Sequence, residues 1–456
     1  MKLTIQQALE QASKMLSQNE FVKAEKIYRS ILQTQPNNLD AHNNLGIILH
    51  NYKNYSEAIN HFKKAILEDS NFFLAYSNLG LSYKSLGEFE EAKKIYIQAI
   101  KIEPNYSQAH NNLGVIFELL NNLDEAKISI KKAIKIDPYN AEFHFNLGNV
   151  LVKEDDFDNA ILSYNKSIEL KPNHKQSLFN RGQIYFKKGL FDLSLKDFDK
   201  CDTNKSRSLS LASLHALNKI EDIFNRIKKY SKIDNTNLRL AAFSSFIQYK
   251  EKRNVDYDFC TNPLDFIKIS NLSNHVENYK LFNNKLIQQI KTIKSFWEPV
   301  NKTTINGFQS KHNLFNNPKG ELEDLKSLIL QEIEIFRLKF KDKTCNFIKN
   351  WPLKKKISCW YVILKQQGYQ NAHIHPDGWL SGVLYLKVLP DLKKNEGAIE
   401  FSLNGEHYSD PNSPKIVYQP KIGDIVLFPS SLYHRTIPFS KDADRISIAF
   451  DLIPEL

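Results

Sequence analysis

A three-residue pattern returns at a fixed interval through the first half of the chain, and it constrains the fold more than any other feature. The pattern is an asparagine before Leu-Gly, and successive copies are 34 residues apart, at Asn44, Asn78, Asn112 and Asn146, with a degenerate Asn-Arg-Gly copy at Asn180. Twelve residues after each glycine stands Ala or Ser, and a large side chain follows four residues later. A period of this length indicates stacked helix pairs.

Prolines mark the places where the second helix of a unit must stop, because proline lacks the backbone N–H and clashes with the preceding turn. They stand at Pro36, Pro104, Pro138 and Pro172. Residues 5 to 38 keep the alanine, tyrosine and proline of the pattern, but Gln11-Ala12 replaces Leu-Gly, so we expect this unit to be a cap. Such units bury their apolar faces only by stacking, which predicts a right-handed superhelix with a concave groove.

This part of the sequence resembles the tetratricopeptide repeat, and the resemblance covers residues 5 to 205, or about six units. From residue 206 to 257 the pattern stays helical but loses the period, with apolar positions such as Leu209, Leu214 and Ile223. We expect this region to close the last repeat and to link two domains.

From residue 258 to 456 short β-rich runs replace the repeats. Val362–Leu364, residues 382–388 and Ile425–Phe428 have the apolar density of buried strands, and helical patterns interrupt them at 276–294 and 321–341. Several short strands with turn signals and flanking helices predict a β-sandwich or barrel with helical support.

Four residues near the end of the chain indicate metal chemistry. His375 and Asp377 form a His-x-Asp motif, His434 follows further β-like sequence, and Arg445 comes after a polar turn. Two imidazoles and one carboxylate leave positions open on non-haem Fe(II) for a chelating co-substrate and O2. The arginine fork can bind a carboxylate with two parallel hydrogen bonds. We expect Arg445 on the strand next to that of His434.

The surrounding sequence resembles the 2-oxoglutarate- and Fe(II)-dependent oxygenases with a double-stranded β-helix, or jelly roll, over residues 258 to 456. The residues that carry the resemblance are 370–386, Gly397–Phe401, Gly423–Pro429, His434 and Arg445–Phe450. The resemblance implies an all-α repeat domain followed by a mainly-β oxygenase domain.

The resemblance also implies a site. Its metal ligands would be His375, Asp377 and His434, its cofactor Fe(II), and its co-substrate 2-oxoglutarate, whose distal carboxylate Arg445 would bind. Two further residues are candidates for that carboxylate, because one lies on the same strand face as the arginine and the other in the strand after the His-x-Asp motif: Ser447 and Tyr385.

The first metal segment has an alternative reading as His373-x-His375, because residues 373, 375 and 377 share one face of an extended strand. The sequence favours Asp377 over His373, since a carboxylate balances the charge of Fe(II) and is the commoner pattern. His373 would then contact either the substrate or one of the metal-binding side chains. Trp379, two residues beyond Asp377, is a candidate for contact with the substrate.

The repeat asparagines are candidates for peptide binding. Superhelical stacking would align Asn44, Asn78, Asn112, Asn146 and Asn180 as an asparagine ladder, and a carboxamide both donates to and accepts from an extended backbone. The alternative is that asparagine occurs there for local packing.

Composition narrows the classes of partner. Lys+Arg 62 against Asp+Glu 51 gives a net charge of +11, but the basic residues are scattered, so we expect no nucleic-acid binding. The four cysteines form no CxxC pair, which fits reduced thiols and a cytoplasmic location. No 18-residue apolar stretch occurs, so we expect no membrane insertion.

These features predict an Fe(II)/2-oxoglutarate-dependent dioxygenase that uses O2 to hydroxylate a protein or peptide captured by its repeat superhelix. Two alternatives stay open. One is a small-molecule oxygenase whose repeats serve assembly, and the other is a non-catalytic scaffold for protein interactions.

Overall fold

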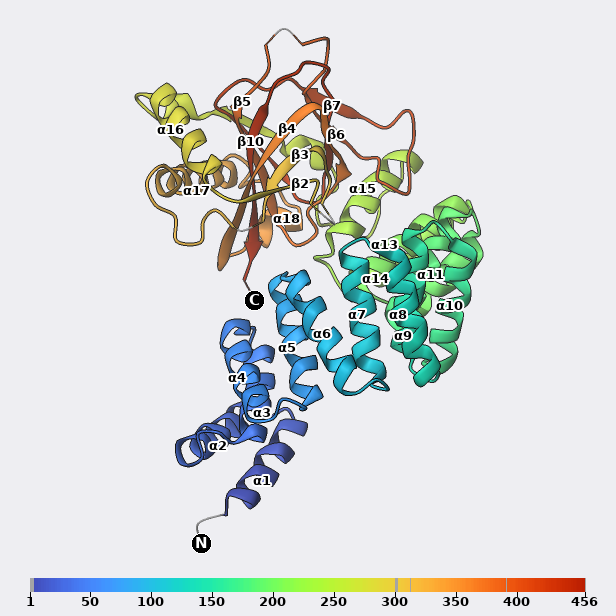
Figure 1. Ribbon diagram of the computed structural model, residues 1–456. Coiled ribbons are helices and arrows are strands. Elements are labelled where there is room, and N and C mark those ends of the chain that lie inside the picture. The colour runs from blue at the N-terminus through green and yellow to red at the C-terminus, as the bar shows by residue number, and fades with distance from the viewer. Residues whose placement is uncertain (1–3, 300–301, 312, 391, 456) are drawn as a thin grey trace. The chain divides into compact units, whose positions relative to one another are not determined.

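The computed structural model describes residues 4–299, 302–311, 313–390 and 392–455. The chain forms two compact units, Met1–Gly189 and Leu190–Leu456 (Figure 1). The boundary between these units falls inside the predicted repeat range. The predicted domain limits at 205 and 257 stay predictions.

The first unit is entirely helical, and each helix packs against the next along the chain. Its helices are α1 (Ile5–Ser17), α2 (Phe21–Thr34), α3 (Leu39–Asn51), α4 (Tyr55–Glu68), α5 (Phe73–Leu86), α6 (Phe89–Ile102), α7 (Ser107–Leu119), α8 (Leu123–Ile136), α9 (Ala141–Lys153), α10 (Phe157–Leu170) and α11 (Lys175–Lys187).

Glycine allows the two helices of a repeat to approach closely. A Cβ atom added at Gly46 would lie 2.6 Å from the ring of Phe62, and one at Gly148 would lie 2.5 Å from the ring of Tyr164. The same pairing recurs at Gly80 and Gly114. The large side chains are buried and fill the space that glycine leaves. The glycine of each repeat therefore lets its two helices meet, and the large residue sixteen positions later fills the contact.

The second unit opens with four helices and continues into a β-rich region with supporting helices. The helices are α12 (Phe191–Cys201), α13 (Asn204–Ala216), α14 (Ile220–Ser231), α15 (Leu238–Glu251), α16 (Tyr279–Lys291), α17 (Glu321–Lys339) and α18 (Asn346–Lys349), with short 3-10 turns at Pro263–Phe266 and Leu272–Asn274. α16 and α17 confirm the helical patterns predicted within the β-rich half.

Ten strands form one antiparallel, curled sheet (Figure 1). Their order is β1-β8-β5-β10-β4-β9-β6-β7, with β3 added beside β4 and β2 beside β3. The strands are β1 (Lys268–Asn271), β2 (Ser295–Trp297), β3 (Thr304–Ser310), β4 (Lys355–His373), β5 (Leu380–Lys387), β6 (Ile399–Ser402), β7 (Lys415–Tyr418), β8 (Asp424–Pro429), β9 (Tyr433–Thr436) and β10 (Arg445–Pro454). The predicted fold class, a helical repeat region followed by a double-stranded β-helix, is confirmed.

The middle strands carry the core of this sheet. β5, β8 and β10 are buried along most of their length, and all six residues of β8 are buried. The continuous apolar run of β8 is typical of a strand that is covered on both faces. Within the described part of the chain, no helix combines the length and the apolar character needed to cross a membrane.

Candidate metal centre

Three histidines come together where β4 meets β9. His373 is the last residue of β4 and pairs with His434 of β9, and His375 follows two residues later. One ring nitrogen from each histidine lies within 4.8 Å of the others. Among the residues that the structure describes, this is the only group of three or more His, Cys, Asp or Glu side chains close enough to share a metal ion.

The hydrogen bonds of the three rings leave the same nitrogen free in each. Nδ1 of His373 lies 2.6 Å from the carbonyl oxygen of Asn371, Nδ1 of His434 lies 3.1 Å from that of Leu432, and Nδ1 of His375 lies 2.8 Å from Oδ2 of Asp451. Because these oxygens only accept, each Nδ1 carries the proton and each Nε2 keeps its lone pair. A metal-binding histidine needs this tautomer.

One of these nitrogens is an orphan in the described structure. Nε2 of His375 is buried and has no hydrogen-bond partner. A buried polar atom without a partner carries a desolvation penalty, which a bound metal ion would remove. The donor set therefore fits a divalent metal that accepts imidazole, such as Fe(II).

The surroundings keep two of the three histidines neutral. Burial, helped by the neighbouring His375, lowers the pKa of His373 to about 3. Burial also holds the pKa of His434 well below its usual 6.5. The ring of His375 stacks on Trp360, and that of His434 lies 4.6 Å from the ring of Phe428. Because neutral imidazole is the form that binds metal, protons do not compete for these two residues near pH 7.

Asp377 does not join the histidines. β4 ends at His373, the chain turns at residues 376–377, and the amide of Gly378 donates to the carbonyl of His375 over 3.0 Å. The turn leaves Asp377 exposed and outside the group of candidate ligands. The expectation that Asp377 rather than His373 completes the metal site gains no support from this geometry.

Arg445 lies in the same enclosed cavity as the histidines, which we call the inner cavity. This cavity is also lined by Tyr385, Ser447 and Trp360, and its volume is about 30 Å³. A space of that size holds about two water molecules, so a bound dicarboxylate requires the lining side chains to move apart.

The guanidinium of Arg445 is a buried cation without an anionic partner. Its side chain is 3% exposed, its Nε donates to the carbonyl oxygen of Gly397 over 3.1 Å, and the guanidinium lies 4.8 Å from the ring centre of Tyr385. No acidic residue among those described contributes to its electrostatics, and burial lowers its pKa from the usual value. A buried, unpaired charge is costly, so this position favours an anionic ligand.

Tyr385 and Ser447 line the inner cavity together with the arginine, and their predicted role toward a carboxylate stays a prediction. They face each other across the β5–β10 pair, and both are buried. The hydroxyl of Tyr385 has no hydrogen-bond partner among the described residues, and burial raises its pKa to about 12 in spite of the nearby Arg445 cation. The hydroxyl is therefore protonated and can donate to an incoming oxygen.

Arg445 does not lie on the strand next to that of His434, where we expected it. β10 and β9 both flank β4, one on each side, so β4 separates Arg445 from His434. The expectation of neighbouring strands was wrong because the strand order of a curled sheet does not follow the chain order. The cavity still unites the two residues, since the curl of the sheet turns these strands toward a common interior.

A second, open space adjoins the histidines, which we call the outer cleft. Its volume is about 460 Å³, and Lys302, Gln309, Lys311 and Asp377 are among its lining residues. Four residues line both spaces: Trp360, Gln370, His373 and His375. His373 and His375 thus lie between the inner cavity, which contains the Arg445 cation, and the outer cleft, which is open to solvent.

Trp379 has a packing position. Its side chain is 5% exposed, its Nε1 donates to the carbonyl oxygen of Phe347 over 3.0 Å, and its ring stacks with that of Phe347. This position favours a role in the core over the expected contact with substrate.

Asp451, which accepts a hydrogen bond from His375, is a site residue that was not predicted from the sequence. A signal for it existed, because Arg445, Ser447 and Asp451 are separated by even numbers of residues along β10 and so share one strand face.

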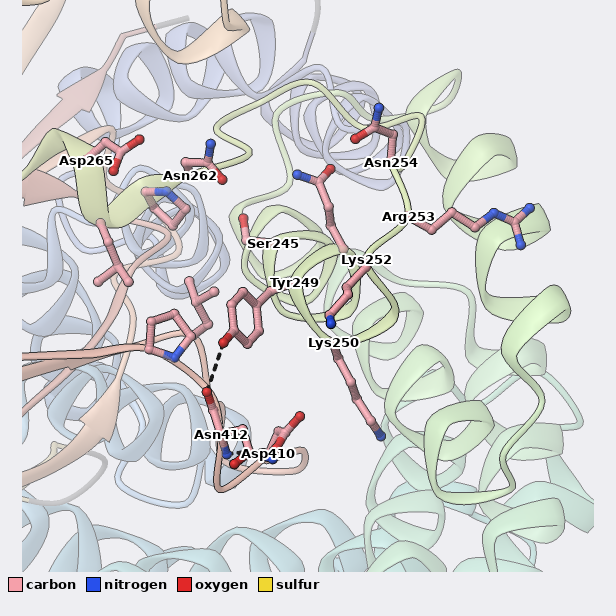
Figure 2. A pocket seen from close by; sticks show the side chains of 15 residues that line it. Ser245, Tyr249, Lys250, Lys252, Arg253, Asn254, Asn262, Asp265, Asp410 and Asn412 are labelled. Carbon is pink, nitrogen blue, oxygen red and sulfur yellow. Dashed lines mark hydrogen bonds between the residues drawn. The ribbon is translucent and has the colours of Figure 1, made fainter.

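A third cavity of the second unit lies elsewhere and has a volume of about 860 Å³ (Figure 2). It lies beside the end of α15, where the hydroxyl of Tyr249 donates to the carbonyl oxygen of Asn412 over 3.0 Å. Lysines and aspartates line it, but no group of metal-ligating side chains among the described residues converges on it. The histidine centre is therefore the better candidate for chemistry.

The asparagines of the ladder already form hydrogen bonds within the repeat region, and some of these bonds join neighbouring repeats. Nδ2 of Asn78 donates to Oδ1 of Asn43 over 3.0 Å, and Nδ2 of Asn146 donates to Oδ1 of Asn111 over 2.9 Å. Asn44, Asn112 and Asn180 also hydrogen-bond to side chains within the first unit. All five asparagines are partly exposed. The ladder thus has a packing role, and carbonyl oxygens on it remain able to accept.

Family models match both halves of the chain. Tetratricopeptide repeat models match residues 39–72, 73–106, 107–140 and 175–206, and related repeat models match 130–161 and 148–189. A model described as "Putative 2OG-Fe(II) oxygenase" matches residues 358–451. No curated protein matches the sequence.

Among solved structures, similar ones include MamA, with 23% identity, a TM-score of 0.33 and coverage of 38% of this chain and 97% of that chain. TTC0263, a tetratricopeptide repeat protein of Thermus thermophilus, has 19% identity and a TM-score of 0.36, and the match covers 40% of this chain and 98% of that protein. YrrB, described as having an unusual peptide-binding site, has 21% identity and a TM-score of 0.33, and the match covers 42% of this chain and 97% of YrrB. The family matches carry the assignment: this chain joins tetratricopeptide repeats, over residues 39–206, to a 2-oxoglutarate/Fe(II) oxygenase-family domain that includes residues 358–451.

Proposed function

We propose that the protein is an Fe(II)- and 2-oxoglutarate-dependent dioxygenase that hydroxylates a protein or peptide captured by its repeats. The observation that carries this proposal is the inner cavity, which combines three histidines with free Nε2 atoms and a buried arginine without an anionic partner. The family match to residues 358–451 supports the same chemistry.

In this proposal His373, His375 and His434 hold the metal. Fe(II) in that position supplies the redox chemistry that couples oxidation of 2-oxoglutarate by O2 to hydroxylation of a substrate carbon. An assignment of Asp377 in place of His373 is the alternative, and the position of Asp377 in an exposed turn speaks against it.

Arg445 binds the distal carboxylate of 2-oxoglutarate in this proposal. Its Nε is engaged with Gly397, so the two Nη groups form the fork that faces a carboxylate. The hydroxyls of Tyr385 and Ser447 add hydrogen bonds to the same group. Arg445, Tyr385 and Ser447 are buried, and the low dielectric of a buried site strengthens each of these interactions.

The substrate enters through the outer cleft. His373 and His375 line both the inner cavity and the outer cleft. A substrate side chain in the outer cleft therefore lies against the metal site without entering the inner cavity, where 2-oxoglutarate binds. This separation lets a protein side chain, which is attached to a bulky backbone, reach the centre from solvent.

The test is whether purified protein converts 2-oxoglutarate to succinate when Fe(II) and O2 are supplied, first alone and then with a mixture of cellular peptides. We expect slow uncoupled turnover alone and faster turnover with peptides. His434→Ala should abolish both. Fe(II) binding without any succinate, under every condition, would favour the non-catalytic scaffold.

Capture of the substrate by the repeats is the second part of the proposal. The asparagine carboxamides are partly exposed and retain acceptor capacity toward the N–H groups of an extended peptide. Each bond lost would weaken capture by about 0.5 to 1.5 kcal/mol. Changing three ladder residues to alanine should therefore weaken capture of a protein substrate while uncoupled turnover survives: Asn78, Asn112 and Asn146.

A matched control separates peptide binding from packing. Asn43→Ala with Asn111→Ala removes the acceptors of the inter-repeat hydrogen bonds but leaves the ladder carboxamides in place. If this double variant weakens capture as much as the ladder variant, the asparagines act through packing. If neither variant affects substrate processing while both stay folded by circular dichroism, a small-molecule oxygenase becomes the better proposal.

A further inference from the structure

A buried carboxylate lies behind the metal site, on the side of His375 away from the free nitrogen. Asp451 of β10 places Oδ2 2.8 Å and Oδ1 2.7 Å from Nδ1 of His375. Asp451 is 9% exposed. No lysine or arginine among the described residues forms an ion pair with Asp451. Its carboxylate is therefore stabilised by the N–H of the His375 imidazole.

The fold builds a cradle for this carboxylate. Ser381 lies opposite Asp451 in the β5–β10 pair, and its hydroxyl donates to Oδ1 over 2.7 Å. The same hydroxyl lies 2.7 Å from that of Ser430, which is fully buried. A Cβ atom at Gly378 would lie 2.6 Å from the Ser430 hydroxyl, so glycine leaves room for this chain of hydrogen bonds.

His375 is the only one of the three histidines with a charged partner. The Nδ1 atoms of His373 and His434 donate to backbone carbonyls, which carry no net charge. Three neutral imidazoles bring no negative charge to a divalent cation, whereas a ligand carboxylate would bring one. The carboxylate of Asp451 is hydrogen-bonded to Nδ1 of His375, on the opposite side of the ring from the metal-binding Nε2. Its negative charge acts on the metal position through this ring.

We infer that Asp451 is a positioning residue of the metal centre: it fixes the orientation and tautomer of His375 and supplies the negative charge that the three histidines lack. This inference rests on the proposed function. Partners of this kind raise the basicity of the ligand, and their loss typically weakens metal binding by about 10- to 100-fold.

The test is a titration of metal-free protein with Co(II) alone, followed by the visible absorption of the bound ion. Asp451→Asn keeps the shape, can accept from Nδ1 of His375 and can donate to Ser381, but it removes the charge. We expect Co(II) affinity to fall by about tenfold or more, with a change in the Co(II) spectrum. The matched control is Asp424→Asn, because Asp424 is a buried carboxylate of β8 that accepts hydrogen bonds from Tyr418, Lys421 and Asn271.

The outcomes separate the two claims. If the parent binds neither Co(II) nor Fe(II), the proposed function fails and the inference fails with it. If the parent binds Co(II) and Asp451→Asn binds it equally well, only the inference is overturned. A lower unfolding midpoint of the metal-free variant with unchanged Co(II) affinity would mean a merely structural role and would also overturn it. Should Asp451→Asn not fold, Ser381→Ala serves instead: weaker Co(II) binding supports the inference, and unchanged binding overturns it.

Discussion

Substituting Arg445 by lysine tests whether the inner cavity binds the carboxylate of 2-oxoglutarate. The arginine already uses Nε on Gly397, so the binding of a carboxylate depends on its two Nη groups. Lysine keeps the charge but offers a single nitrogen, so one charge-assisted hydrogen bond is lost, at a cost of about 1.5 to 3 kcal/mol. At about 1.4 kcal/mol for each factor of ten, this predicts a rise in the 2-oxoglutarate requirement of about 10- to 150-fold.

The assay is the dependence of succinate formation on 2-oxoglutarate, with Co(II) affinity as the internal control. Arg445 contributes no metal ligand, so the affinity for Co(II) should stay near that of the parent. An unchanged 2-oxoglutarate requirement in Arg445→Lys would refute the reasoning, because the carboxylate would then be bound elsewhere. Equal losses of Co(II) and 2-oxoglutarate binding would point to collapse of the site instead.

Tyr385→Phe is a companion to this variant. The hydroxyl of Tyr385 is buried without a hydrogen-bond partner in the described structure, so its removal should not lower the free energy of unfolding. Affinity for 2-oxoglutarate should fall by about 0.5 to 1.5 kcal/mol if the hydroxyl donates to the carboxylate. Urea unfolding and the same succinate assay measure the two effects separately.

Three further predictions concern the metal ligands, the sheet and the repeats. In a Co(II) titration His373→Ala should lose most of the affinity and Asp377→Ala little; the reverse order would restore Asp377 as the ligand. Burial by itself would raise the pKa of Glu332, but hydrogen bonds from Lys268 and a serine hold this pKa below its usual value. The ionised carboxylate therefore stabilises the fold above about pH 4.3. This stabilisation is lost as the pH falls through the pKa of Glu332 in the folded state. Glu332→Gln should cost about 3 to 5 kcal/mol at pH 7 in urea unfolding, and a loss equally large at pH 3 would contradict this account. Gly148→Ala should lower the free energy of unfolding by about 1 to 3 kcal/mol, because its Cβ would lie 2.5 Å from a buried tyrosine ring, and a thermal midpoint equal to that of the parent would count against the clash.

The sequence by itself determined the repeat architecture and the class of the second half. Each repeat forms its contacts between residues close in the chain, such as Gly46 with Phe62, so a periodic pattern states the packing almost completely. The strands were also readable, because β5 and β8 are buried on both faces and appear as continuous apolar runs.

The tertiary structure decided the composition of the site. His373, His375 and Asp377 alternate in a way that fits either metal motif, and the outcome depends on where β4 ends and the chain turns, which no local pattern specifies. The cradle of Asp451 draws on β5, on β10 and on the turn after β8, and the inner cavity joins Arg445 of β10 to His434 of β9, on the other side of β4. Contacts between residues so distant in the chain are fixed by the order and curl of the strands, and the sequence encodes these only through the packing of the whole sheet.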